Sequence, residues 1–252
     1  MEKIEELAKL FAKYKIYPKS CYDKYSPVKV FQRMFPENHY SKDLGTFLSY
    51  QNYKPVQRGA DLSWWGKNFF TGETGRRVLI VSQDSNYKDA GSVVLAAFLF
   101  PVVNSSVQYQ KFVHEMDVER YFGFSRYKRI KDQLIEWGID LDFLYITDAS
   151  KVYKSGSWEN EDFDREKSKK LLESEIEFCK PNLIILLGAP ALRLLDGNKK
   201  YSEIVESGKY IYIKGIKSVV SPFFIGNGIG QPNFDERLKT ATRLIKKLMK
   251  KK

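Results

Sequence analysis

The chain has 252 residues, of which 43% are hydrophobic and 15% are aromatic. This length and composition are typical of a folded globular protein with a sizeable core, and they exclude an intrinsically disordered chain. The two cysteines, Cys21 and Cys179, are too few for a disulfide framework or a four-cysteine metal site. The longest apolar run, residues 93–103, is far shorter than the roughly 20 residues that a membrane span requires.

The balance of charged residues favours a polyanionic partner. There are 42 Lys and Arg against 31 Asp and Glu, which gives a formal net charge of +11. Six of the positive charges lie in residues 243–252, and without them the net charge falls to +5, an ordinary value for a globular domain. A second basic cluster occurs within residues 126–131. Lysine and arginine clusters gain affinity for phosphates by releasing counterions, so nucleic acid is the expected partner.

The first part of the chain predicts one helix followed by an irregular region. Residues 2–13 carry apolar side chains at the spacing of an amphipathic helix, directly after Met1 and with no apolar leader. We therefore expect an intracellular protein, in the cytoplasm or in the nucleoid or nucleus, without membrane attachment. Residues 17–75 are rich in aromatic side chains, proline and glycine. The Trp64, Trp65, Phe69 and Phe70 cluster within them is expected to be core rather than a stacking platform.

Three short apolar runs then predict buried strands at residues 77–82, 143–147 and 183–187, because parallel strands that are covered on both faces read as continuous apolar segments. Two shorter strands are expected at 210–214 and 218–220. Helical patterns occupy residues 110–121, 127–137, 164–178, 189–195 and 235–251. This alternation predicts an α/β fold, a three-layer α/β/α sandwich with a short, mainly parallel central sheet. We expect a single domain, in which residues 1–75 form an elaboration packed on an α/β core of residues 76–252.

Polar residues follow three of the predicted strands. The first strand runs into Gln83 and Asp84, the second into Asp148, and the last short strand into Ser221. Each segment by itself reads as a solvated turn. Ligands of open α/β sheets bind beyond the carboxyl ends of the strands, so three such segments together indicate a site at that edge.

These segments resemble the motifs of the uracil-DNA glycosylase superfamily, in the same order. Residues 78–87 look like its first motif, an apolar strand ending in Gly-Gln-Asp-Pro-Tyr-His, and residues 145–151 are similar to its strand ending in Asn with a Lys beyond it. Residues 179–195 resemble its Pro…Leu-Gly…Ala…Leu-Leu strand and helix. Residues 221–234 are similar to its His-Pro-Ser loop and closing helix. The resemblance covers roughly residues 76–250 and implies a uracil-DNA glycosylase-like fold.

The resemblance implies a DNA glycosylase that flips a deaminated or modified base, uracil or a related one, out of DNA and hydrolyses its N-glycosidic bond. Asp84 matches the carboxylate that positions water or stabilises the sugar cation. The residues expected at the base are Gln83, Asn86, Tyr87, Phe98 (or Phe100, if neither belongs to a core helix), Asp148 and Ser221. Those expected at the DNA are Lys151, Pro222, Phe224, Ile225, Asn227 and Ile229.

The motifs depart from the family at two positions. Asp148 stands where the family has its base-reading Asn; a protonated Asp can pair with uracil, whereas an ionised Asp prefers the amino edge of adenine or cytosine. The family's catalytic His falls at Val220 or Ser221, and losing such a group costs about 2–4 kcal/mol of transition-state stabilisation. The branch of the family with an iron–sulfur cluster is excluded, because it needs four cysteines.

Two other interpretations remain open. The chain could be a nucleic-acid-binding module of the same fold without catalytic activity, or a metal-dependent nuclease in which Asp84 and Asp148 share Mg²⁺ with Glu161 or Asp162. In the glycosylase reading no metal or cofactor is required, the partner is double- or single-stranded DNA, and the protein is a monomer. The glycine-containing segment 226–230 reads as a loop that fills the vacated base stack, or as a plain flexible hairpin.

Overall fold

A computed structural model of the chain describes residues 2–14, 63–72, 74–83, 105–115, 123–151, 165–225 and 228–250. The chain divides into two compact units built from interleaved segments. The first comprises Met1–Trp64, Asp84–Tyr127 and Ser150–Glu175, and the second Trp65–Gln83, Lys128–Ala149 and Ile176–Lys252. This division differs from the predicted boundary after residue 75, because the chain returns to the first unit between successive strands of the second.

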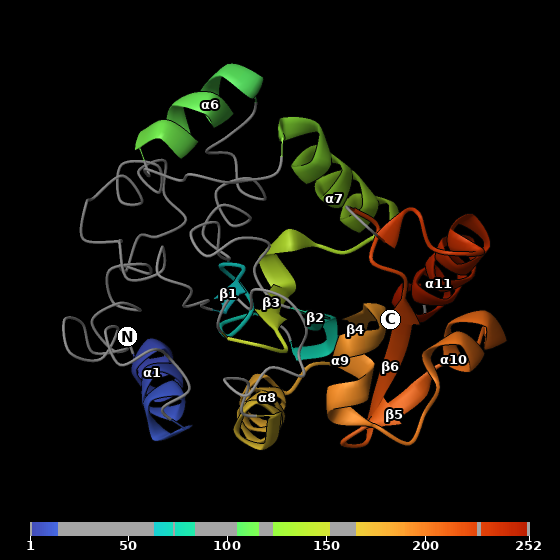
Figure 1. Ribbon diagram of the computed structural model, residues 1–252. Coiled ribbons are helices and arrows are strands. Elements are labelled where there is room, and N and C mark those ends of the chain that lie inside the picture. Colours follow the sequence, from blue (N-terminus) through green and yellow to red (C-terminus); the bar gives the residue numbers. More distant parts are fainter. Residues whose placement is uncertain are drawn as a thin grey trace. The chain divides into compact units, whose positions relative to one another are not determined.

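The second unit is built on a six-stranded, mostly parallel sheet in the order β1-β3-β2-β4-β6-β5 (Figure 1). Its strands are β1 (Trp64–Trp65), β2 (Val78–Ser82), β3 (Leu144–Asp148), β4 (Leu183–Leu187), β5 (Ile211–Ile213) and β6 (Ile216–Ser221). β2 pairs in parallel with β3 and β4, and β4 pairs in parallel with β6. Only the pair of β5 with β6 is antiparallel among those with a described register. The α/β class with a mainly parallel sheet is therefore confirmed.

The central strands form where the sequence predicts them because their side chains are buried on both faces. All five residues of β4 are buried, and in β2 and β3 only the last residue is partly exposed. The observed bounds of these strands lie within one residue of the predicted ones. A continuous apolar run of this length stabilises a strand in the middle of a sheet, where helices cover both sides.

Helices connect and cover the strands of the second unit. They are α7 (Phe124–Glu136) and α8 (Arg165–Cys179), which both units share, and α9 (Gly188–Leu195), α10 (Tyr201–Ser207) and α11 (Phe234–Met249). α9 packs on β4 and β2, and α11 packs on β6. Nζ of Lys246 in α11 lies 3.1 Å from Oε1 of Glu136 at the end of α7. α10 was not predicted, because its seven residues are too few for a clear helical period.

The first unit contains α1 (Glu2–Tyr14) and α6 (Ser106–Glu115), with the beginnings of α7 and α8. The predicted amphipathic helix at the amino terminus is confirmed as α1, whose Leu7 and Phe11 are fully buried. The hydroxyl groups of Tyr14 and Ser174 are hydrogen-bonded at 2.9 Å, which links α1 to α8. Tyr109 of α6 is also fully buried and its ring lies 5.7 Å from that of Tyr127.

The aromatic cluster before β2 belongs to the core, as predicted. Trp64, Trp65 and Phe69 are 2%, 4% and 0% exposed. The Trp65 ring stacks on Tyr145 of β3 with ring centroids 5.9 Å apart and planes within 8° of parallel. Ring stacking against a sheet strand leaves no open face for a base, so this cluster is not a stacking platform.

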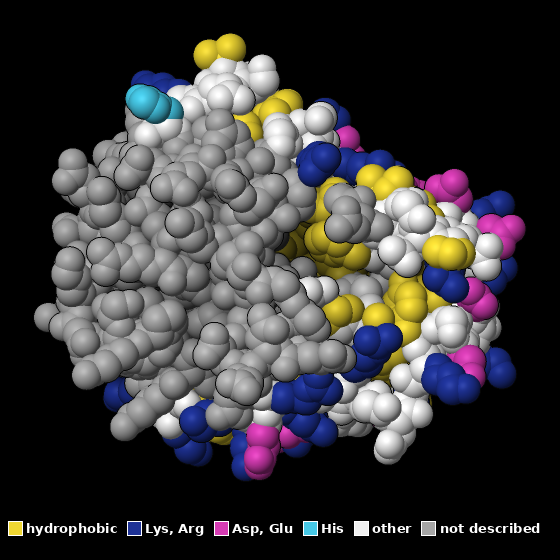
Figure 2. All heavy atoms as spheres, viewed as in Figure 1, with side chains coloured by type: hydrophobic (Ala, Val, Ile, Leu, Met, Phe, Trp, Pro, Cys, Tyr) yellow, Lys and Arg dark blue, Asp and Glu magenta, His cyan; other side chains and the backbone are white. Residues whose placement is uncertain are grey.

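Acidic and basic side chains alternate over the carboxyl-terminal helices. Figure 2 shows Lys and Arg next to Asp and Glu over α10 and α11, and the Arg237 guanidinium donates from Nε to Oε1 of Glu206 at 2.9 Å. This hydrogen bond lowers the pKa of Glu206. The surface of these helices is therefore not of a single charge. None of the described helices has both the length and the apolar composition to cross a membrane.

Candidate functional site

The carboxyl ends of the parallel strands bring the predicted polar residues to one edge of the sheet. In register, Ser82 at the end of β2 lies opposite Asp148 at the end of β3, and Leu187 of β4 lies opposite Ser221 at the end of β6. Neighbouring strands are about 4.8 Å apart, so Asp148 and Ser221 are separated by three spacings, or about 14 Å across this edge. A ligand the size of a nucleotide can span that distance.

The order of the strands reverses within this edge. The chain passes from β2 to β3 on one side and then to β4 on the other, so the direction of winding reverses at β2. Ligands of open α/β sheets bind at such a reversal, beyond the carboxyl ends of the two strands. Gln83 follows β2 and is half-buried, and Gly188 follows β4 and begins α9. Gln83 and the half-buried Asp148 lie at the carboxyl ends of neighbouring strands, β2 and β3.

Ser221 is completely buried at the end of β6. Its hydroxyl donates to the carbonyl oxygen of Pro222 at 3.1 Å. A hydroxyl that donates one hydrogen bond keeps its lone pairs as acceptors. Because Ser221 has no exposed surface, its hydroxyl does not reach a ligand in this structure, and its predicted contact with the base is corrected.

The loop after β6 is folded back into the core, which corrects part of the predicted DNA interface. Pro222 is buried, and Phe224 and Ile225 are only 1% and 2% exposed. The Phe224 ring meets Trp137 edge to face, with ring centroids 5.4 Å apart. These three side chains are therefore not surface contacts for DNA, because their apolar surface already packs inside the second unit. Ile229 is 41% exposed and remains available at the surface.

Gly228 closes this loop on itself. A Cβ atom at this position would lie 1.8 Å from the carbonyl oxygen of Phe223, so only glycine fits. Its amide donates to the carbonyl of Ile225 at 3.3 Å, and its own carbonyl accepts from the amide of Gln231 at the same distance. The close approach holds Ile229 at the outer side of a compact turn.

Lys151 also requires a correction. It is 1% exposed, and its Nζ lies 2.6 Å from Oε2 of Glu175, which is fully buried in the first unit. Ser63 donates to the other oxygen of the same carboxylate, and the Phe11 ring lies 5.4 Å from the ammonium nitrogen. The ammonium group is thus engaged in the interior and is not a phosphate contact. Neither the ion pair nor its burial was predicted.

Five predicted site residues lie outside the described residues: Asp84, Asn86, Tyr87, Phe98 and Asn227. The same holds for the alternative stacking residue Phe100 and for Glu161 and Asp162 of the metal hypothesis. In the described part of the chain, no three His, Cys, Asp or Glu side chains are grouped so that they could hold a metal ion. The roles predicted for the residues that lie outside the described part of the chain therefore stay predictions.

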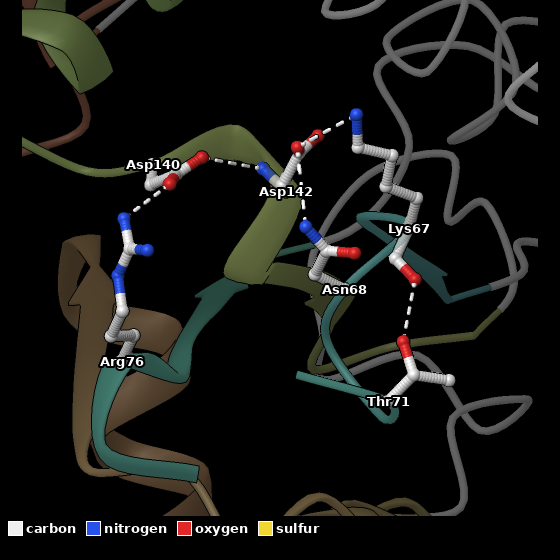
Figure 3. A network of polar contacts seen from close by, with 6 residues as sticks. All are labelled: Lys67, Asn68, Thr71, Arg76, Asp140 and Asp142. Atoms are coloured by element: carbon white, nitrogen blue, oxygen red, sulfur yellow. Dashed lines mark hydrogen bonds and ion pairs between the residues drawn. The ribbon is translucent and has the colours of Figure 1, made fainter. Parts of the chain in front are cut away.

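A polar network at the opposite end of β3 is structural (Figure 3). Lys67 Nζ lies 3.1 Å from Oδ2 of Asp142, and Asp140 pairs with Arg76 while its Oδ1 accepts from the amide of Asp142 at 3.0 Å. Asn68 and Thr71 complete the group. These contacts fasten the turn after β1 to the start of β3. They lie at the amino end of β3, whereas Asp148 is at its carboxyl end.

Arg77, whose side chain is buried, also strengthens the amino edge of the sheet. The Arg77 guanidinium is 8% exposed and donates to the carbonyl oxygens of Cys179 and Phe70, each at 3.4 Å. Burial lowers the pKa of Arg77, because the charged form loses hydration. Its backbone amide donates to Oδ1 of Asn182 at 3.1 Å, so the residue joins the beginnings of β2 and β4.

Comparison with known proteins gives the chain no family. No family model matches it, and no curated protein is significantly similar to it in sequence.

Proposed function

We propose that the protein is a DNA glycosylase-like enzyme with a three-layer α/β/α fold of the uracil-DNA glycosylase type. The observation that supports this proposal is the convergence of three strand ends: Gln83, Asp148 and Ser221 lie at one edge of the sheet. In the sequence, Asp84 directly follows Gln83. The same three segments carry the resemblance in the sequence. Double- or single-stranded DNA is the proposed partner. The proposed enzyme is intracellular and acts as a monomer.

In the proposed reaction the bond between the base nitrogen and C1′ of deoxyribose breaks, and its electron pair leaves with the base. Water adds its oxygen to C1′ and loses a proton to solvent, and the departing base takes up a proton from solvent and becomes neutral. Asp84 orients this water and stabilises the positive charge that develops on the sugar. Asn86, Tyr87 and Phe98 (or Phe100) hold the extruded base, which an aromatic face stabilises by stacking. Ile229, exposed on the compact turn, fills the space that the base vacates.

Asp148 is proposed to read the base edge, which gives a prediction about the substrate. An ionised carboxylate only accepts hydrogen bonds and favours a base that presents an amino group, whereas an amide both donates and accepts. Replacing Asp148 by Asn is therefore expected to shift the ratio of activities toward uracil by about 10- to 100-fold, as for one bidentate base contact. Excision rates on uracil and on amino-bearing bases measure the ratio. An unchanged ratio would show that Asp148 does not contact the base.

The proposed function is tested by a strand-cleavage assay with EDTA present. Labelled oligonucleotides that carry uracil, hypoxanthine, xanthine or only normal bases are incubated with the full chain and then treated with alkali. We expect alkali-dependent nicking at one modified base, and a loss of about 10²- to 10³-fold in Asp84→Ala, the effect of removing one charge-stabilising group.

Two other outcomes would contradict the proposal. In a parallel reaction with Mg²⁺ in place of EDTA, nicking that needs no alkali and is absent when EDTA is present would indicate a metal-dependent nuclease. Binding of the oligonucleotides without any nicking would leave a nucleic-acid-binding module. Asp235→Ala serves as the matched control, because this aspartate is exposed in the first turn of α11 and is not among the predicted site residues.

A further inference from the structure

The β5–β6 hairpin presents two tyrosines on one exposed face. β5 is the outermost strand on its side of the sheet. Lys214 and Gly215 join the strands with φ angles of 49° and 78°, the backbone that two-residue hairpin turns require. Ile211 and Ile213 of β5 are buried, and Tyr212 between them is 57% exposed. Alternation of side chains along a strand puts Tyr210, two residues earlier, on the same side as Tyr212.

The aromatic rings on this face lie beside a lysine. The ring centroids of Tyr210 and Tyr212 are 5.5 Å apart, with planes at 84°. Lys217 of β6 lies opposite Tyr212 in register, and its Nζ is 5.6 Å from the centroid of the Tyr210 ring. We call Tyr210, Tyr212 and Lys217 the tyrosine face. A ring that is more than half exposed has apolar surface open to a planar ligand.

The surroundings of the tyrosine face are positively charged. Lys209, Lys214 and Lys217 are exposed, and the sequence has no Asp or Glu from residue 207 to residue 234. Lys214 pairs with Glu177 of α8 at 2.7 Å, which neutralises one of these charges, and Lys217 remains beside the rings. A hydrogen bond with Tyr210 raises the pKa of Tyr212. A tyrosine phenol is neutral near pH 7 with or without this shift, so it does not repel an anion.

Aromatic faces flanked by lysines suit one class of ligand. Bases of a single strand stack on exposed rings, and the phosphates between them attract the lysines. A duplex keeps its bases stacked on one another and cannot offer them to a ring at a protein surface. We propose that the tyrosine face of the β5–β6 hairpin binds single-stranded nucleic acid by base stacking on Tyr210 and Tyr212 and phosphate contact with Lys217.

This surface is separate from the candidate site. Lys217 lies four residues before Ser221 on β6, which corresponds to about 13 Å along the strand. The tyrosine face is therefore toward the amino end of β6, whereas the polar strand ends are at its carboxyl end. The inference goes beyond the proposed function, because strand binding here requires neither Asp84 nor Asp148.

The test is the affinity of the full chain for a fluorescently labelled oligodeoxythymidylate, measured by anisotropy at several salt concentrations. Removing both rings in Tyr210→Ala/Tyr212→Ala is expected to weaken binding by about tenfold or more. Tyr212→Trp, which keeps a stacking surface, is expected to retain the affinity. Lys217→Ala is expected to reduce the slope of log K against log salt by about one.

Matched controls use α7, where Ile135 is 58% exposed and Lys128 is 59% exposed. Ile135→Ala and Lys128→Ala remove an exposed apolar side chain and a lysine from another surface and are expected to bind normally. The inference is overturned if the wild type does not bind the oligonucleotide, or if the double tyrosine variant binds it equally well. Asp84→Ala is expected to bind the oligonucleotide with wild-type affinity, so loss of base excision and loss of strand binding are decided separately.

Discussion

Replacing Glu175 by Gln is expected to destabilise the protein by about 3–5 kcal/mol, because it leaves the ammonium group of Lys151 buried without its counter-charge. Lys151 and Glu175 are 1% and 0% exposed, and the Nζ–Oε2 distance is 2.6 Å. Water cannot replace the lost carboxylate at that degree of burial. Urea denaturation followed by circular dichroism measures the change in the free energy of unfolding.

Two further variants distinguish the buried charge from the loss of packing. Lys151→Met/Glu175→Met removes both charges and is expected to recover most of the stability, since a buried ion pair is often no better than an apolar pair of similar volume. Lys128→Ala breaks an exposed ion pair with Asp132 and is expected to cost at most about 1 kcal/mol. Equal losses in Glu175→Gln and Lys128→Ala would contradict the argument.

The buried pair also explains the geometry of the first unit. Ser63, which precedes β1, donates to the Glu175 carboxylate, and Lys151 follows β3 by three residues. Phe11 of α1 lies beside the ammonium group. Segments far apart in the sequence therefore meet at one carboxylate of α8. An ionic contact has a narrower range of acceptable geometries than an apolar one, so it selects this arrangement of segments over other packings.

The central sheet was predictable because its signal is local. The apolar runs of β2, β3 and β4 are short, continuous and bounded by polar residues, and each predicted bound lies within one residue of the observed one. That Asp148 and Ser221 lie at the same edge of the sheet was also predicted, because parallel strands share the direction of their carboxyl ends. Both results follow from the pattern of hydrophobic residues along the sequence and from the rule that ligands of open α/β sheets bind beyond the carboxyl ends of the strands.

Burial of individual residues was less predictable because it depends on contacts between distant segments. Phe224 and Ile225 follow a strand end and precede a glycine-containing segment, a local pattern that favours a surface loop, yet Trp137 of another segment covers Phe224. Lys151 was assigned to the DNA-binding surface because residues 145–151 resemble a family motif that carries a Lys beyond its strand. The sequence did hold one signal: Glu175 follows Leu171 by four residues and precedes Ile176 on a buried face of α8.

Replacing Trp137 by Ala is expected to destabilise the second unit by about 3–5 kcal/mol, the usual cost of truncating a large buried aromatic side chain. Trp137 is fully buried directly after α7. Its Nε1 donates to Oγ1 of Thr242 in α11 at 2.8 Å, and its ring meets Phe224 edge to face. The indole therefore joins α7, α11 and the loop after β6. Thermal or urea unfolding measures the loss.

The hydrogen bond and the ring contact of Trp137 can be separated. Thr242→Val keeps the volume but leaves the buried indole N–H without this acceptor, and is expected to cost about 1–3 kcal/mol. Trp137→Phe keeps an aromatic ring against Phe224 and is expected to be less destabilising than Trp137→Ala. If Thr242→Val were as harmful as Trp137→Ala, the hydrogen bond and not the packing would hold the indole.

The position of Trp137 connects this stability to the candidate site. Phe224 lies three residues after Ser221, and the exposed Ile229 directly follows Gly228 in the same loop. Loss of the ring removes the support of Phe224, so the loop gains freedom at the end of β6. In the folded fraction of Trp137→Ala we expect base excision to fall more than oligonucleotide binding, because the tyrosine face lies at the other end of β6. An equal fall in both would indicate that the unit responds as a whole.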